Sequence, residues 1–454
     1  MYARDRDFAA DGDHSNLAPA PWNVPTSTVF NARSATTEYG NYLLGTVSST
    51  DQFGSVTRFT GARPAGVPTT LAAASGLFVL QPNGTGGAIF GTAAPSRAGV
   101  TRDYYWNNNA FRIIQPKSKR TNIFAGTELD VSDRLTAFVD GSLYHANSVT
   151  FREPDGITQS TDGFIIVPVT NPFNPFGNRF FSTTGAPNAD GTARLTGTPS
   201  AVSITNKRLT DLATRTDWVD TSVYRGVAGL RGKLHNSWSW EAAVLYSAAR
   251  VNENEEGPSR ESLLIAAINQ TDPARAFNPF TRTFAVQNGQ LVVTGPYINP
   301  ESVQSTFRSS FIRSGITKLG SGDFRASGDV FPLWGGNQIG GAFGGEFRYE
   351  AYDDFRPPFA GLNPAGSGLD PDSNDFLGFS PNSDTHGNRH VAALYAEAVV
   401  PLVGREFTLP FVRSLELSAS ARYESYTDFG DTTKPKYGVN WKPTNWAMLR
   451  ASYN

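Results

Sequence analysis

The histidine pair in the stretch HGNRH, His386 and His390, is the first place where residue type and spacing suggest chemistry. On a helix, a spacing of four would put both imidazoles on one face, where they could share a metal ion. This stretch leads directly into an alternating segment that begins at residue 391. Four residues along a strand cover about 13 Å, which is too far for one ion. A shared metal would therefore require a loop conformation, and we predict no metal site here.

Two further stretches match ligand-binding loops only in part. The acidic DPDSND at 370–375 has spacing that would suit calcium, but it lacks the central glycine and the late glutamate of a Ca²⁺ loop, and Pro371 stiffens it. The glycine-rich NGTGGAIFG at 83–91 has no strand–loop–helix context and no following Gly-Lys-Ser/Thr, so a flexible loop is favoured over a phosphate site.

Catalytic chemistry finds no support in the sequence. The five histidines are scattered through predicted loops and turns, and no Ser–His–Asp set, activated nucleophile or carboxylate pair in a plausible cleft emerges. We therefore predict that the protein is not an enzyme, and we assign no catalytic residue, no metal and no cofactor.

Composition narrows the structural class. The 454 residues include 44 Gly, 29 Pro, 8 Trp, 16 Tyr and 31 Phe, a balance that favours strands and turns over helices. The absence of cysteine excludes disulfides and zinc–thiolate sites. The net charge of −2 gives no reason to expect a nucleic-acid partner. The charged N-terminus is unlike a secretory signal, and no run of about 18 apolar residues predicts a transmembrane helix.

Apolar and polar residues alternate with a period of two in several long segments, which is the pattern of β-strands. Leu135, Val139 and Leu143, for example, share one face of a segment whose other face carries Thr136 and Asp140. These segments run to about 10–13 residues, whereas strands of globular proteins are nearer five or six. The clearest of them are 134–145, 223–234, 238–248, 338–350 and 415–426.

The connections between these segments are asymmetric. Short turns are predicted at 235–238, 333–337 and 442–445, and long polar loops at 146–201, 251–305 and 352–388. Tryptophans gather at the segment ends: Trp238, Trp240, Trp334, Trp441 and Trp446. Strands of about this length, loops of unequal length and aromatic girdles are typical of a transmembrane β-barrel with a hydrated lumen. The alternative is a soluble β-sheet protein whose apolar face packs against a second sheet.

The C-terminal stretch ARYESYTDFG…KPKYGVNWKPTNWAMLRASY resembles the barrel of TonB-dependent outer-membrane receptors. The matching positions are Arg422, Tyr423, Glu424, Tyr426, Asp428, Phe429, Gly430, Pro435, Lys436, Gly438, Trp441, Leu449, Arg450, Ala451, Ser452 and Tyr453. Segments 394–402 and 229–247 look like strands and a periplasmic turn of that family. The Asn-Pro-Phe segments at 171–177 and 274–280 look like its loops. The resemblance covers roughly residues 100–454.

The resemblance implies an all-β fold, an incomplete transmembrane antiparallel β-barrel with long extracellular loops and short periplasmic turns. We expect a loop-rich early barrel segment with about two strands at 1–118, and barrel strands and long loops at 119–454. The family's signal peptide, TonB-contacting box and plug domain are not visible, so we expect an internal fragment of a barrel that has about 22 strands in the family. An unclosed sheet leaves unpaired backbone groups in lipid, so we expect this piece alone not to insert stably.

The function implied by the resemblance is TonB-energised uptake of a scarce solute, such as a ferric siderophore, a cobalamin-like molecule or an oligosaccharide. The implied partners are outer-membrane lipid of a Gram-negative bacterium, an extracellular solute, and the TonB complex acting through a plug domain. A passive porin-like barrel and a secreted β-rich adhesin or carbohydrate-binding protein remain alternatives. Charged residues expected to face the lumen are candidates for ligand contact: Arg225, Arg231, Glu346, Arg348, Arg422, Glu424 and Arg450.

Overall fold

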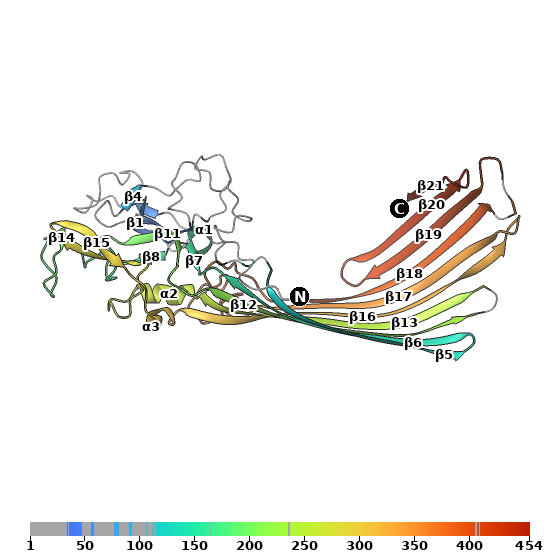
Figure 1. Ribbon diagram of the computed structural model, residues 1–454, viewed down its shortest axis with the longest axis horizontal. Helices are drawn as coiled ribbons and strands as arrows, with labels where there is room; N and C mark the ends of the chain where they lie inside the picture. The colour runs from blue at the N-terminus through green and yellow to red at the C-terminus, as the bar shows by residue number, and fades with distance from the viewer. Residues whose placement is uncertain are drawn as a thin grey trace.

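The computed structural model shows two regions, a long curved sheet and a compact group of loops at one end of its strands (Figure 1). It describes residues 34, 36–47, 56–58, 77–80, 90–92, 106, 111, 113, 115–163, 165–234, 237–404, 406–407 and 409–454. We call the sheet the wall and the loop region the cap. The cap comprises the described residues up to 92 and the connections 153–214, 260–307 and 356–384.

The wall is a ten-stranded sheet in which every pair of neighbouring strands is antiparallel. Its strands follow one another around the curve in sequence order, and the two end strands do not pair with each other within the described residues. The fold is therefore an incomplete transmembrane β-barrel. The strands are β5 (Lys117–Ser132), β6 (Leu135–Arg152), β12 (Arg215–Lys233), β13 (Ser239–Ser259), β16 (Arg308–Pro332), β17 (Gln338–Phe355), β18 (Thr385–Val403), β19 (Ser414–Tyr426), β20 (Gly430–Lys442) and β21 (Leu449–Tyr453).

The register confirms the predicted faces of the wall. Leu230 of β12 lies opposite Ala137 of β6 and Ala242 of β13, so these apolar side chains share one face. That face is exposed: the large side chains of Val244 and Leu394 are 62% and 66% accessible. Phe138 lies on the opposite, inner face and packs against Gly229, where any Cβ would meet its ring at 2.4 Å.

The wall strands are longer than the sequence predicted, with 13 to 25 residues in all but β21. β13, for example, continues through residues 251–259, which the sequence assigned to a loop. The outward residues of this extension include Asn252 and Asn254, so the apolar alternation that marks the strand ends before the strand does. The hydrogen-bonded ladder therefore extends beyond the apolar part of the sheet.

The short turns lie at the end of the wall away from the cap, as predicted (Figure 1). Tryptophan indoles anchor this end by donating to backbone carbonyls. Trp238 Nε1 donates to Asp329 O at 2.9 Å, Trp334 Nε1 to Leu402 O at 3.0 Å, and Trp441 Nε1 to Phe411 O at 3.2 Å. An amphipathic ring with one polar atom suits the boundary between lipid and water.

The cap contains small sheets and three short helices. Its main sheet has the order β4-β3-β1-β11-β7, with β2 paired to β1 and β8 paired to β11. The elements are β1 (Asn41–Val47), β2 (Val56–Arg58), β3 (Leu77–Leu80), β4 (Phe90–Thr92), β7 (Gly156–Thr158), α1 (Gln159–Asp162), β8 (Ile165–Val167), β9 (Phe181–Ser182), β10 (Leu195–Thr196), β11 (Val202–Arg208), α2 (Glu261–Ile268), β14 (Arg282–Gln287), β15 (Gln290–Pro296) and α3 (Glu301–Gln304).

One hydrophobic core joins the cap segments. Tyr42, Ile157, Ile204, Phe277 and Phe307 are each fully buried in a single cluster, although they come from widely separated parts of the chain. The N-terminal region thus contributes four described strands, β1–β4, where the sequence predicted about two. The glycine-rich stretch 83–91 lies outside the described residues except for its end in β4. Among the described residues, no helix is long and apolar enough to cross a membrane.

Candidate functional site

All seven charged candidates lie on the inner face of the wall. In the register, Glu346 of β17 and Glu424 of β19 both lie opposite Ala393 of β18, and Arg422 lies opposite Tyr395. The same pattern places Arg225 and Arg231 on the inner face of β12, away from Tyr224 and Leu230. On β21, Arg450 lies opposite Asn440, whose side chain donates to Glu416 at 2.8 Å.

Four of the candidates belong to one continuous chain of ion pairs that crosses β17, β18 and the end of β19. Carboxylates and guanidinium groups alternate along it, and an acid stands at each end. We call this chain the lumen ladder. In the order in which they pair, its members are Asp428, Arg389, Glu350, Arg348, Glu346, Arg422 and Glu424.

The upper part of the lumen ladder connects the extracellular turn to the wall. Arg389 places Nε 2.7 Å from Glu350 and Nη1 3.5 Å from Asp428, which lies in the turn between β19 and β20. Glu350 also forms an ion pair with Arg348, whose Nε lies 2.6 Å from the carboxylate. The guanidinium of Arg389 lies 5.5 Å from the ring centroid of Tyr426. The Arg389 side chain thus links β18 to β17 and to the turn between β19 and β20.

The lower part of the lumen ladder is more enclosed. Arg348 Nη1 lies 3.0 Å from Glu346, whose other oxygen is 2.8 Å from Arg422 Nη2. Arg422 Nε is 2.9 Å from Glu424, and the Tyr426 hydroxyl donates to the same carboxylate at 2.9 Å. Every guanidinium in the ladder therefore bridges two carboxylates. Such a surface is polar and wettable, and its fixed geometry gives it little tendency to rearrange.

The remaining candidates have separate surroundings. Arg231 pairs with Glu128 of β5 and lies 5.6 Å from the centroid of Phe138. Arg450 Nε lies 2.9 Å from the Met448 sulfur. Arg225 is exposed on the inner face and forms no ion pair with any described residue. These three are therefore not part of the lumen ladder.

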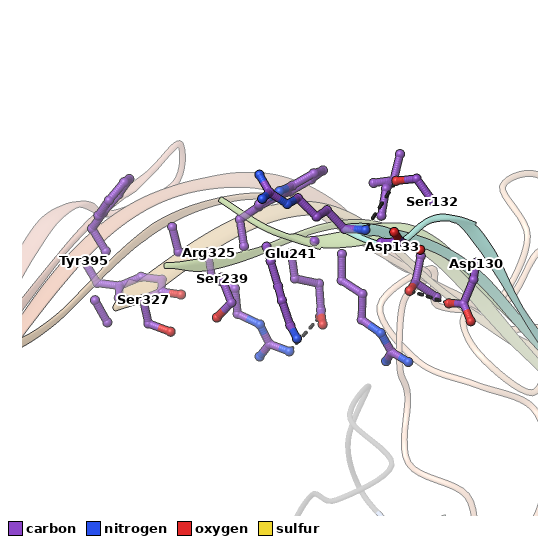
Figure 2. Close-up of a pocket in the computed structure, with 18 residues that line it drawn as sticks. Asp130, Ser132, Asp133, Ser239, Glu241, Arg325, Ser327 and Tyr395 are labelled. Carbon is purple, nitrogen blue, oxygen red and sulfur yellow. Dashed lines mark hydrogen bonds and ion pairs between the residues drawn. The ribbon is translucent and has the colours of Figure 1, made fainter. Parts of the chain in front are cut away.

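A groove of about 750 Å³ lies near the short-turn end of the wall. Figure 2 shows Glu241 and Arg325 there, joined across β13 and β16 by an ion pair of 2.6 Å on the same side of the sheet as Ser239. Arg231 lines the same groove. Sequence reasoning did not select Glu241 and Arg325 as candidates, although each has the correct parity for the inner face.

A second ionic cluster lies where the inner face meets the cap. The oxygens of three carboxylates approach within 4.8 Å of one another: Asp217, Glu253 and Glu255. Arginines neutralise them, since Arg152 pairs with Asp217, Arg313 with Glu253, and Arg215 with Glu255 at 3.2 Å. The partly buried Arg215 also lies 3.2 Å from Asp155 of the cap. No sequence signal predicted this cluster, because its members come from strands and a connection that meet only in the folded sheet.

Buried asparagines fasten the cap loops, including those in the Asn-Pro-Phe segments. Asn171, Asn174 and Asn278 are fully buried, and each accepts a hydrogen bond at 2.9 Å from the backbone N–H two residues later. Their amide groups donate to other segments: Asn171 Nδ2 reaches Ile268 O at 2.7 Å. The repeated motif therefore builds both local turns and long-range connections.

The DPDSND stretch lies beside an acidic cavity of about 190 Å³ in the cap, lined by Asp162, Glu261, Asp370 and Asp372 among others. Burial, reinforced by the negative charges of Asp162 and Asp375, raises the pKa of Glu261 to about 8. Burial also raises the pKa of Asp162 to about 6. Asp375 itself is buried and accepts from Arg260 Nε at 2.8 Å and Ser262 N at 2.7 Å.

The histidines of HGNRH lie within β18, which begins at Thr385 rather than at residue 391. His386 lies opposite Asp353, and His390 opposite Tyr349, on the outer face of the wall. The His390 ring is 5.0 Å from the Tyr349 centroid and 5.5 Å from that of Phe347. His390 therefore belongs to an aromatic group on the lipid-facing side. It lies four positions along β18 from His386.

The sheet has an exposed apolar outer face and an ion-paired inner face, with short turns at one end and a folded cap at the other. These are features of an outer-membrane-type β-barrel. The family model described as "TonB dependent receptor-like, beta-barrel" matches residues 144–454, and the chain belongs to this family. This is a family of transport receptors rather than of enzymes.

Among curated proteins the search found no match. Solved structures that match include a mutant of the ferric enterobactin receptor of Pseudomonas aeruginosa in complex with enterobactin, at 13% identity and a TM-score of 0.31. A second mutant of that receptor matches at 14% identity and a TM-score of 0.30. Each alignment covers 74% of this chain, which spans 41% of the receptor's length.

Proposed function

We propose that the chain is the barrel portion of a TonB-dependent receptor in the outer membrane of a Gram-negative bacterium, and that the whole receptor imports a scarce solute. The observation that carries this proposal is family membership over residues 144–454, joined to a wall that is apolar outside and ion-paired inside. The exposed apolar stripes argue against a secreted protein in which they would pack against a second sheet.

In this proposal each region has one task. The apolar outer face contacts outer-membrane lipid. The cap receives an extracellular solute, and the TonB complex acts through a plug domain that occupies the lumen. The plug and the solute pass along an inner face on which most arginines are already paired with carboxylates. Such a face offers hydrogen bonds without a large excess of either charge, which suits passage rather than tight retention.

The seven inner-face residues are our candidates for contact with the solute or the plug. The best placed are Arg348 and Arg422. The side chain of Arg348 is 24% exposed and that of Arg422 is 34% exposed, while contacts with carboxylates hold both guanidinium groups in place. A fixed, partly exposed donor can recognise oxygen-rich solutes at little entropic cost. Ferric siderophores, cobalamin-like molecules and oligosaccharides all meet that description, and they form the set to be tested.

Uptake by the source bacterium tests the proposal. Three labelled probes are supplied at nanomolar concentration to the parent strain, to a strain lacking this gene and to a strain lacking TonB: a ⁵⁵Fe–siderophore, cyanocobalamin and a maltodextrin. We expect uptake of one probe to be lost in both mutants, while diffusion of a small sugar is unchanged. Uptake that needs this gene but survives without TonB would replace the proposal with the passive-channel alternative.

A further inference from the structure

A single arginine joins the cap to the wall at their border. β12 begins at Arg215 and β13 ends at Ser259, so both strands meet the cap there (Figure 1). Arg215 Nη1 lies 3.2 Å from Glu255 of the wall, and its Nε lies 3.2 Å from Asp155 of the cap. One guanidinium group is therefore shared between two carboxylates that belong to different regions.

The ion pairs around Arg215 contain one acid more than they contain bases. Three guanidinium groups pair with four carboxylates, and we call these residues the junction cluster: Arg152, Asp155, Arg215, Asp217, Glu253, Glu255 and Arg313. Nearby, Arg208 of β11 attracts Asp155, and Asp162 of α1 repels it. Arg308 of β16 pairs with Glu301 at 3.6 Å. Because these additions are balanced in charge, the excess of one acid remains among the described residues.

Burial makes this excess negative charge costly. Asp155, Asp217 and Glu255 are only 3%, 2% and 2% exposed. A buried carboxylate without a cation of its own favours its protonated form, and carboxylates that lie close together share such a proton. Burial raises the pKa of Asp155, although the charge of Arg215 opposes the rise. The folded junction therefore holds a proton more readily than the same carboxylates would in water.

Asp155 lies at the point where the strand ends and the cap connections are fastened together. Its carboxylate accepts from the backbone N–H of Ser259, the last residue of β13. Its backbone carbonyl accepts from Leu209 N at 2.9 Å, and Ser259 O accepts from Leu377 N at 3.0 Å. A change of charge on the junction cluster therefore acts directly on the hydrogen bonds that connect β13 to three segments of the cap.

We propose that the junction cluster is a proton-controlled latch between the cap and the wall. A proton taken up by the carboxylates around Arg215 removes the excess negative charge and lets the cap pack closely on the strand ends. Loss of that proton leaves an uncompensated buried charge, so the junction loosens until water reaches it.

The direction of the pH dependence follows from the preference of the folded junction for the proton. The closed latch binds more protons than the open one, so it holds most firmly at acid pH and weakens as the pH rises. In the proposed receptor, an extension that rests on the proposed function, the latch makes access to the lumen easier at neutral pH than at acid pH.

Hydrogen exchange of the purified full-length protein in mild detergent tests the latch at the Ser259 amide. At each pH the intrinsic rate of an unstructured peptide is divided by the observed rate, which removes the ordinary pH dependence of exchange. We expect this protection factor to fall about tenfold between about pH 5 and about pH 8, the change that a difference of one pKa unit produces. The parent and all variants carry Glu261→Gln, so that the titration of α2 does not contribute.

Glu255→Gln gives the decisive result. It equalises the carboxylates and guanidinium groups of the junction cluster, so protection of the Ser259 amide near pH 8 should rise about tenfold, to the value that the parent shows near pH 5. Loss of a merely structural ion pair would instead lower protection at every pH. Either that outcome or an unchanged slope would overturn the proposal. Asp155→Asn should flatten the slope in the same way, and it replaces Glu255→Gln if that variant does not assemble.

The matched control is Glu241→Gln. This glutamate lies on the inner face of the same strand and pairs with Arg325 at 2.6 Å, far along β13 from the junction cluster. The control should keep the slope of the parent, and a slope lost in the control as well would contradict the latch. Recovery of the protein outside the outer-membrane fraction would contradict the proposed function instead, because the slope at Ser259 tests the latch independently of location.

Discussion

The wall and the cap place their apolar residues in opposite ways. In the wall, large apolar side chains such as Leu394 and Val244 are mostly exposed. In the cap, Phe277, Phe280 and Phe307 are fully buried in one cluster. The same residue types thus face outward in one region and inward in the other. The difference indicates that lipid surrounds the wall and water surrounds the cap.

Polar groups show the converse arrangement. The wall keeps its ion pairs on the inner face, partly open to the lumen, as with Arg422 and Glu346. The cap buries its polar groups, and the neutral amides of Asn174 and Asn278 lie within its interior with their hydrogen bonds satisfied. Exposed ion pairs contribute little stability, whereas a buried polar group that loses its partner is costly. Substitutions in the two regions should therefore have very different effects.

The largest effect is expected from Phe277→Ala in the cap. Removing a fully buried phenyl ring should cost about 3–5 kcal/mol, because the transfer energy is lost and a cavity remains. Hydrogen exchange of the intact protein in detergent should show faster exchange throughout the cap and unchanged exchange in the wall. Leu394→Ala, on the exposed outer face, should change neither. Loss of protection in the wall as well would show that the two regions are not separable.

The next effect is expected from a charge on the outer face. Leu417→Arg should destabilise the inserted barrel by about 2–4 kcal/mol if it lies near the middle of the membrane, and should prevent assembly of the full-length protein. Arg422→Ala, five positions along the same strand but on the inner face, should leave assembly intact. Heat-modifiable mobility on gels measures assembly. Equal effects of the two substitutions would mean that the faces have been assigned the wrong way round.

A smaller effect is expected from Asn278→Ala. This asparagine accepts from Phe280 N at 2.9 Å and donates to Arg282 O at 2.9 Å. Its loss should cost about 1–3 kcal/mol, since two buried backbone groups lose a partner. Exchange should accelerate in residues 278–299 before the rest of the cap. Asn147→Ala on the exposed outer face of the wall provides the comparison and should have an effect within about 0.5 kcal/mol.

A pH dependence of the stability of the cap is expected as well. Because the folded cap raises the pKa of Glu261 from 4.5 to about 8, folding favours its protonated form. The stability of the cap should therefore be greatest below about pH 4.5, fall as the pH rises, and level off above about pH 8. Protection of α2 against hydrogen exchange reports this change. Glu261→Gln should remove most of the slope, and an unchanged slope would assign it to another group.

The sequence predicted the wall well and the cap poorly, for a physical reason. The faces of β12, β13, β17 and β19 follow from alternation alone, because lipid on one side and water on the other constrain every second residue. Strand lengths were underestimated where backbone pairing between strands continues past the apolar part of the sheet, as at Asn252 and Asn254. The lumen ladder was only half predicted: parity placed Glu346 and Arg422 on the inner face, but pairing with Arg389 depends on the register between strands.

The cap could not be predicted because its contacts are not local. Its Asn-Pro-Phe segments were noticed, but their burial depends on segments elsewhere in the chain, as when Asn171 donates to Phe277 O at 3.1 Å. The short strands β1–β4 carry no long alternation. Pairing of β1 with β11 joins residues about 160 positions apart, which no periodicity records.

The way the cap is assembled has a consequence for the order of folding. The Tyr42 hydroxyl donates to Pro279 O, 237 residues further along the chain, and the segments that supply the core lie between different pairs of wall strands. Contacts of such high order form slowly, because each long chain closure costs entropy before any burial compensates for it. Each segment must also reach the outer side of the membrane before it can meet the others. The cap should therefore be the last part of the protein to mature, and its phenylalanines would remain exposed to surface proteases until it does.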